Sequence, residues 1–304
     1  YEMTDWEALN AWVQTLWPEL EEADQPYIML SYVDPSQLTG FEERREKALE
    51  NFLDMNGQTG EEKEYFLNMN TKVDTPLQYR WTKGWTFVTA DFVSQCGVIL
   101  GIFLAIGIAP MFCGEWHDRT KALIATTKNG WKKIAGVKVM AAVLFTLELY
   151  GIITVSSVFL QIVFLGTEGW DMPIQCIKIL AAAPWNVLQA EIYEYIYLLL
   201  AALGYTGIVL LCSALTKSNY VSLLISLAII FVPMAVSQFL PLWGQRLLDL
   251  IPFVGSSTDI FRTNTYPLFG LRIWSPYLLI TAPISLGLIS LPFAVYLWSK
   301  RARI

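Results

Sequence analysis

The residues best suited to chemistry lie in the segment 114–138, a short basic stretch between two long apolar ones. Trp116, Leu123 and Ile124 recur there at helical spacing, while Lys121 falls on another face, which predicts an amphipathic helix. Such a helix can lie on membrane headgroups or dock into a groove of a protein partner. A solvated basic loop with no partner is the alternative. The segment is therefore predicted to bind a membrane surface or a protein partner, not to catalyse a reaction.

Groups for covalent or metal chemistry are scarce in the sequence. The one histidine, His117, excludes a site built from several histidines and a Ser–His dyad within the membrane. The chain has no phosphate-binding G-x-x-x-x-G-K-[ST] loop. Glu42 and Glu43 are interpreted as a solvated helix face, and Glu191 and Glu194 as hydrated near the membrane surface. The sequence thus predicts no enzyme, no metal and no bound cofactor.

Composition and charge predict two domains. The chain is 54% hydrophobic, with a mean hydropathy of +0.42 that few soluble proteins reach. Residues 1–80 carry a net charge of −11, whereas residues 81–304 carry +5. We therefore expect an acidic soluble domain over 1–84 and a membrane domain over 85–304. No basic, aromatic surface suggests nucleic acid as a partner.

Five segments are long and apolar enough to cross a hydrocarbon core of about 30 Å, which takes about 20 helical residues. They are approximately Phe92–Cys113, Val139–Leu165, Ile192–Leu215, Tyr220–Leu242 and Pro276–Trp298. The predicted fold class is all-α: a polytopic helical membrane protein with a helical domain outside the membrane. The remaining segment, 243–272, is interpreted as re-entrant or interfacial, with a short helix suggested by Leu247, Leu248, Leu250 and Ile251.

Basic residues in the short loops set the predicted orientation. Ten lie on the side of the loop 114–138, Lys217 and the C-terminus, and four lie on the other side. Because basic loops stay in the cytoplasm, residues 1–84 are expected outside a cell membrane and the C-terminus inside. A domain carried across in this way needs a further span upstream of Tyr1, which would make six.

The outer domain is predicted to be helical because three threonines each precede a glutamate by three residues, the pattern of a capping box. The pairs are Thr4 with Glu7, Thr39 with Glu42 and Thr59 with Glu62, before expected helices at Trp6–Leu16, Phe41–Met55 and Glu61–Met69. Residues 1–95 contain no cysteine, so the domain is not a disulfide scaffold. It is expected either to bind a ligand or partner, or to cap the spans.

The segment 114–138 resembles the cytoplasmic loop of permease subunits of ABC-2-type exporters, especially those of Gram-positive bacteria. In those permeases an acidic residue is followed by a pattern near T-x-x-L-x-x-T-x-x-G-x-x-x-x-x-x-K, matched by Glu115, Thr120, Leu123, Thr126 or Thr127, Gly130 and Lys138. Looser matches at 61–66, 75–77, 173–175 and 215–218 extend the resemblance over most of the chain.

The resemblance implies an ATP-driven exporter of an amphipathic substrate, such as an antimicrobial peptide, a drug or a lipid. It implies two permease copies or paralogues and two cytosolic ATPase subunits, which carry the ATP and Mg²⁺. The residues expected to dock the ATPase are Glu115, Trp116, Arg119, Thr120, Leu123, Ile124 and Lys128. The alternative is a membrane receptor or immunity protein that binds an antimicrobial or lipid without transport.

Glu148 is an ionisable residue inside a predicted span. It follows Lys138 by ten residues, so at ~1.5 Å per residue it lies ~15 Å into the membrane. A carboxyl group there costs roughly 3 kcal/mol to insert and is expected to avoid lipid. Two roles stay open: lining the transport path, or a structural hydrogen bond to a neighbouring helix, with Tyr205 as a candidate partner.

Overall fold

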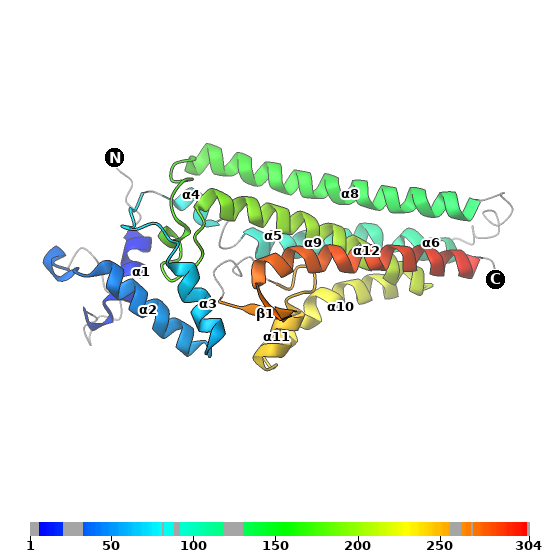
Figure 1. Ribbon diagram of the computed structural model, residues 1–304. Helices are drawn as coiled ribbons and strands as arrows, with labels where there is room; N and C mark the ends of the chain where they lie inside the picture. Colours follow the sequence, from blue (N-terminus) through cyan, green and yellow to red (C-terminus); the bar gives the residue numbers. More distant parts are fainter. Residues whose placement is uncertain are drawn as a thin grey trace. The chain divides into compact units, whose positions relative to one another are not determined.

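The computed structural model describes residues 6–20, 33–80, 82–87, 92–117, 130–255, 263–268 and 270–302. Helices dominate this part of the chain, which contains a single two-stranded sheet (Figure 1). Five of the helical segments are long and apolar enough to cross a membrane, which confirms the predicted class of polytopic helical membrane protein.

The chain folds as two compact units. Unit 1 comprises Tyr1–Ala90, Leu160–Tyr193 and Thr258–Ser275, and unit 2 comprises Asp91–Phe159, Glu194–Ser257 and Pro276–Ile304. Unit 1 is therefore assembled from three separate stretches of sequence. Two of them belong to the region that the sequence assigned to the membrane domain.

Unit 1 contains the three helices expected near the N-terminus, at close to the expected bounds. They are α1 (Trp6–Leu16), α2 (Phe41–Met55) and α3 (Glu61–Asn70), followed by the short α4 (Lys83–Phe87). Three short 3₁₀ helices and one short π-helix complete the described part of the unit: η1 (Pro18–Leu20), η3 (Pro35–Gln37) and η6 (Ile174–Cys176) are 3₁₀, and η5 (Gln161–Leu165) is π. Their apolar faces form its core, in which Leu49, Leu53 and Phe66 are buried.

The capping boxes predicted for α2 and α3 are wrong. The residues at the two caps are Gly40 and Gly60, and neither helix has a side-chain cap. The Glu42 carboxylate instead accepts a hydrogen bond from the backbone N–H of Leu77, at 3.0 Å. A capping box pairs groups that are close in sequence, whereas the Glu42 carboxylate is taken by an N–H group 35 residues away. The box at Thr4 lies outside the described residues.

The segment 243–272 also contributes to a β-hairpin, which the sequence did not predict. The strands β1 (Thr265–Leu268) and β2 (Leu271–Trp274) pair antiparallel. Glu62 of α3 accepts hydrogen bonds from the backbone N–H and the hydroxyl of Thr265, at 2.9 and 2.8 Å. Among the described residues of 243–272, the predicted short helix corresponds to α11 (Leu242–Leu248), which ends before Leu250 and Ile251.

A buried arginine joins α2 to the rest of unit 1. Arg45 is 2% exposed, and burial lowers the pKa of its guanidinium group. It donates hydrogen bonds to the carbonyl oxygens of Ile179 and Ala181, at 3.0 and 3.1 Å, and to Asn70 Oδ1 at 2.8 Å. Because buried carbonyl groups need donors, this one side chain fixes the segment near residue 180 against α2 and α3.

Unit 2 is built mainly from the long apolar helices, and all five predicted spans are confirmed as helical. They are α5 (Val93–Ile108) with α6 (Pro110–His117), α8 (Gly130–Leu160), α9 (Val187–Leu215), α10 (Asn219–Ser237) and α12 (Ser275–Ala302). In the most apolar stretch of α9, 67% of the residues are buried, against 6% for α8. The central helix of the bundle is therefore α9, and α8 is peripheral (Figure 1).

The helices α9 and α12 touch through glycines. A Cβ atom on Gly204 would lie 2.1 Å from the carbonyl oxygen of Pro283, and one on Gly287 would lie 2.6 Å from the Cα of Gly204. One on Gly207 would lie 2.6 Å from the carbonyl oxygen of Gly287. Real Cβ atoms do not approach backbone so closely. Small residues allow this backbone-to-backbone packing between membrane helices.

Replacing Gly204 with leucine is expected to force α9 and α12 apart. Overpacking costs about 1–3 kcal/mol, which corresponds to a loss of about 2–10 °C in Tm for the detergent-solubilised protein. The matched control is Gly151→Leu on α8, where an added Cβ meets nothing within 4 Å. Equal melting temperatures for the two variants would show that the glycine contact is dispensable.

Candidate functional site at the base of the basic loop

The structure describes the base of the predicted docking loop. Glu115 is described with its side chain, and Trp116 lies on α6 with only its backbone described. The other predicted docking residues lie outside the described residues: Arg119, Thr120, Leu123, Ile124 and Lys128. The helix α8 begins at Gly130. We call Glu115, Lys138 and the residues that contact them the loop base.

An ion pair closes the loop base. Glu115 at the end of α6 and Lys138 on α8 lie on the two sides of the loop, and their Oε1 and Nζ atoms are 2.6 Å apart. The side chains are only 13% and 21% exposed, so water screens them less than a surface pair. Lys138 also donates a hydrogen bond to the carbonyl oxygen of Met111. The sequence singled out both residues without predicting that they pair.

Aromatic rings extend the loop base to α12. The Nζ atom of Lys138 lies 5.7 Å from the ring centroid of Phe112 and 5.5 Å from that of Trp298. The two ring centroids are themselves 5.2 Å apart, and Trp298 is buried. A cation at this distance is attracted to the negative ring faces. Lys138 therefore binds a carboxylate, a carbonyl group and two rings at once.

A serine of α9 completes the attachment of α6. Because Pro110 starts α6, the first backbone N–H groups of that helix need partners outside the ordinary helical ladder. Ser213 Oγ accepts hydrogen bonds from the backbone N–H groups of Phe112 and Cys113, at 2.9 and 3.2 Å. It donates in turn to the carbonyl oxygen of Ala109, at 2.6 Å. This buried hydroxyl locks the junction of α5 and α6 onto α9.

The loop base reaches three other helices. Besides Ser213 of α9 and Trp298 of α12, Asn219 of α10 contacts the thiol of Cys113, with Oδ1 and Sγ 3.0 Å apart. Both sides of the loop are thus tied to the same ends of the remaining spans. A displacement of the loop must move these helix ends together, so the arrangement suits mechanical transmission. Among the described residues, no group of three or more His, Cys, Asp or Glu could hold a metal ion.

Glu148 faces away from the central helix. Two side chains of α8 mark the face that packs on α9: the Thr146 and Thr206 hydroxyl oxygens are 2.6 Å apart, and Tyr150 donates to the carbonyl oxygen of Tyr195 at 3.1 Å. Glu148 is two residues from both Thr146 and Tyr150, about 200° around the helix. It therefore lies on the opposite side of α8.

The neighbours of Glu148 on that face are apolar and exposed, including Leu144 at 59% and Ile152 at 57%. Glu148 is itself exposed, and within the described part of the chain no hydrogen bond or ion pair reaches it. The candidate bond to Tyr205 is not formed, because the Tyr205 hydroxyl donates to the carbonyl oxygen of Ser226 at 2.8 Å. Any partner of this carboxyl group in the bilayer must come from outside the described chain.

The interpretation of Glu191 and Glu194 as hydrated is wrong. They are 5% and 0% exposed, and Glu191 accepts a hydrogen bond from Gln161 Nε2 at 3.3 Å. Their position near the start of an apolar segment suggested contact with water, but packing around α9 covers them.

Removing the cation of the loop base is expected to destabilise unit 2. Lys138→Met leaves Glu115 partly buried without its partner and should lower the free energy of unfolding by about 1–2 kcal/mol, which thermal unfolding in detergent measures. The double variant Glu115→Gln/Lys138→Met should recover part of that loss. Lys133→Met, at an exposed position of the same helix, is the matched control. If Lys138→Met behaves like this control, the pair contributes nothing.

The two faces of α8 are expected to respond oppositely to substitution. Thr146→Val removes a buried hydroxyl contact and should cost about 1 kcal/mol. Glu148→Leu removes a carboxyl group from an exposed apolar face, so the melting temperature of the purified chain should stay the same or rise. A marked loss of stability in Glu148→Leu would mean that the carboxyl group has a partner within the chain.

Comparison with models of known protein families, with curated proteins and with solved structures finds no match for this chain.

Proposed function

We propose that this chain is the membrane-spanning permease subunit of an ATP-driven exporter of the ABC-2 type, which moves an amphipathic substrate. A separate cytosolic ATPase chain would bind ATP and Mg²⁺. The observation that carries the proposal is the loop base, where the two sides of a basic amphipathic loop are paired with each other and attached to the ends of the other spans. A loop that only orients the chain in the membrane needs no such attachment.

The proposed mechanism follows from these contacts. Closure of the ATPase subunits on their nucleotide displaces the loop, and the pair of Glu115 and Lys138 keeps α6 and α8 moving together. Ser213 and Trp298 pass the displacement to α9 and α12. Helices that are rigid between their ends then tilt, which changes the face on which the path between two permease copies opens. Glu148, directed away from α9, is proposed to line that path.

A second candidate function is a membrane receptor or immunity protein that binds an antimicrobial or a lipid without transport. An apolar cavity in unit 1, lined by Trp12, Trp17, Phe41 and Tyr79 among others, favours ligand binding by this chain and is compatible with both functions. The two candidates differ in whether an ATPase subunit is bound. Purification from native membranes, followed by identification of stoichiometric partners, separates them directly.

The docking prediction is tested with the loop residues Leu123 and Ile124. Replacing both with aspartate puts charge where apolar side chains are expected to fill a groove, so the ATPase should no longer copurify. The matched control exchanges the two residues for each other, Leu123→Ile/Ile124→Leu, and should retain the partner. Full retention of the ATPase by the aspartate variant would refute docking through this loop.

Within the same complex, Glu148→Gln and Glu148→Leu test the proposed path. Glutamine keeps the shape and the hydrogen-bonding capacity, whereas leucine removes both. We expect the leucine variant to alter ATP hydrolysis by the reconstituted complex more than the glutamine variant does. Unchanged hydrolysis in both variants would remove Glu148 from the proposed site.

A further inference from the structure

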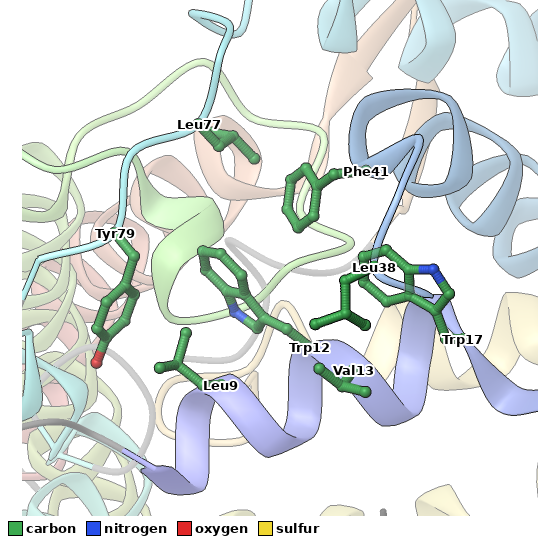
Figure 2. Close-up of a pocket in the computed structure, with 8 residues that line it drawn as sticks. All are labelled: Leu9, Trp12, Val13, Trp17, Leu38, Phe41, Leu77 and Tyr79. Atoms are coloured by element: carbon green, nitrogen blue, oxygen red, sulfur yellow. The ribbon is translucent and has the colours of Figure 1, made fainter. Parts of the chain in front are cut away.

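Unit 1 contains an apolar cavity of about 270 Å³ beside α1 and α2 (Figure 2). Its wall is largely aromatic, with Trp12, Trp17, Phe41 and Tyr79 among the lining residues. For comparison, an engineered apolar cavity of about 150 Å³ holds benzene. The space is therefore large enough for an aromatic or branched aliphatic side chain of a ligand.

The rings form a continuous wall. Trp12 lies 5.6 Å from Phe41 and 5.5 Å from Tyr79 between ring centroids, and Trp17 lies 6.1 Å from Phe41. Rings at these distances pack against each other. They do not stand apart around a central cation, as the rings of a cage for quaternary ammonium do. The wall is therefore suited to an apolar group.

Two hydrogen-bond donors in this wall are unused. The indole nitrogens of Trp12 and Trp17 are buried and find no hydrogen-bond partner among the residues that the structure describes. The side chains are only 8% and 3% exposed. In Figure 2 the nitrogen of Trp12 lies on the side of Leu9 and Tyr79. Buried N–H groups are normally paired, so this donor calls for an acceptor, such as a carbonyl oxygen, supplied by the occupant.

Acidic residues stand next to the cavity. A second cavity of about 380 Å³ shares Phe41 and Leu77 with the first and is lined by Glu42 and Glu43. Glu42 is engaged by the N–H of Leu77, whereas the Glu43 side chain is exposed. A ligand group that fills the aromatic cavity thus has a carboxylate beside it.

The nearby cation does not cancel this charge. Arg44 lies 5.5 Å from the ring centroid of Trp17, but its Nη1 atom is paired with Glu19 Oε1 at 2.5 Å. A hydrogen bond from its own backbone N–H, and then Arg44, hold the pKa of Glu19 below its usual value, so this carboxylate stays ionised. Residues 1–80 as a whole carry a net charge of −11. The region around the cavity therefore attracts cations.

From this juxtaposition we propose that unit 1 binds a cationic peptide segment. An aromatic or branched aliphatic side chain of the peptide enters the cavity. The backbone carbonyl oxygen beside it accepts a hydrogen bond from the indole N–H of Trp12. A neighbouring lysine or arginine of the peptide forms an ion pair with Glu43. A peptide supplies these three groups within two adjacent residues, which matches two cavities that share a wall. The inference goes beyond the proposed function, because such binding requires neither an ATPase nor transport.

The test uses the full chain in an uncharged detergent and a small fluorinated probe, acetyl-Lys-(4-fluoro-Phe)-Lys-amide. Its ¹⁹F NMR signal should broaden and shift in a saturable way on addition of the protein. The matched probe acetyl-Glu-(4-fluoro-Phe)-Glu-amide carries the same ring with opposite charges and should bind at least tenfold more weakly. Micelles without protein give the contribution of the detergent.

Three variants assign binding to the cavity. Leu38→Trp places a ring in the cavity and should weaken binding at least tenfold without lowering the melting temperature. Trp12→Phe keeps a ring but removes the N–H, and should weaken binding about fivefold, the value of one ordinary hydrogen bond. Glu43→Gln should weaken binding of the lysine probe and flatten its dependence on salt, while leaving the glutamate probe unchanged or improved.

Clear outcomes overturn the proposal. It fails if the two probes bind equally, because the acidic residues would then play no part. It also fails if the folded Leu38→Trp variant binds the lysine probe as tightly as the unchanged protein, because the ring would then lie elsewhere. Displacement of the probe by choline at similar concentration would assign the cavity to quaternary ammonium ligands instead.

Discussion

The packing of unit 2 depends on the backbone contact between α9 and α12 at Gly204 and Gly287. Water is absent from a hydrocarbon core, so polar groups there must find partners within the protein. The close approach places α9 in the centre of the bundle, where Tyr205 reaches the carbonyl oxygen of Ser226 and Tyr197 reaches that of Gly255. One steric constraint therefore positions the helix whose residues Tyr197, Tyr205, Thr206 and Ser213 make buried hydrogen bonds to other segments of unit 2.

The spans follow from the sequence because their signal is local: about 20 consecutive apolar residues have few alternatives to a membrane helix. The helices of unit 1 were also predicted, since their apolar residues recur at helical spacing. The capping boxes failed because a hydroxyl or carboxylate near a helix start has several possible partners. Glu42 and Glu62 bind groups that are 35 and 203 residues away, and no local pattern contains that information.

The sequence of the hairpin contains residues that favour β-strands, although the segment 243–272 is interpreted as re-entrant or interfacial. Thr265, Tyr266, Ile273 and Trp274 favour strands, and Gly270 immediately precedes β2 with a φ of 78°. The apolar residues Leu247, Leu248, Leu250 and Ile251 direct the interpretation toward a short helix at the start of the segment instead. Length was the discriminating feature: two runs of four residues around a glycine are too short for helices but sufficient for paired strands.

The candidate site was predicted in part. The segment 114–138 and Glu148 stand out in the sequence because charge in or next to a span is unusual. The partners of these residues could not be predicted, since Ser213 and Trp298 are unremarkable members of apolar stretches. The cavity in unit 1 is a similar case. Its wall combines residues from α1, from the start of α2 and from 77–79, and only the fold brings their rings together.

The hydroxyl groups of the spans also bear on how the protein is made. Thr146 and Thr206 can each donate to the carbonyl oxygen four residues earlier in their own helix, at 2.8 and 2.9 Å, and Ser226 and Ser290 do the same at 2.8 and 2.7 Å. A newly synthesised span can therefore enter lipid alone with these groups satisfied. When α9 is synthesised after α8 and packs on it, the hydroxyl group of Thr146 or of Thr206 only has to rotate for the two to form a hydrogen bond. Insertion and assembly can proceed as separate steps, helix by helix, without these four hydroxyl groups waiting unpaired in the bilayer.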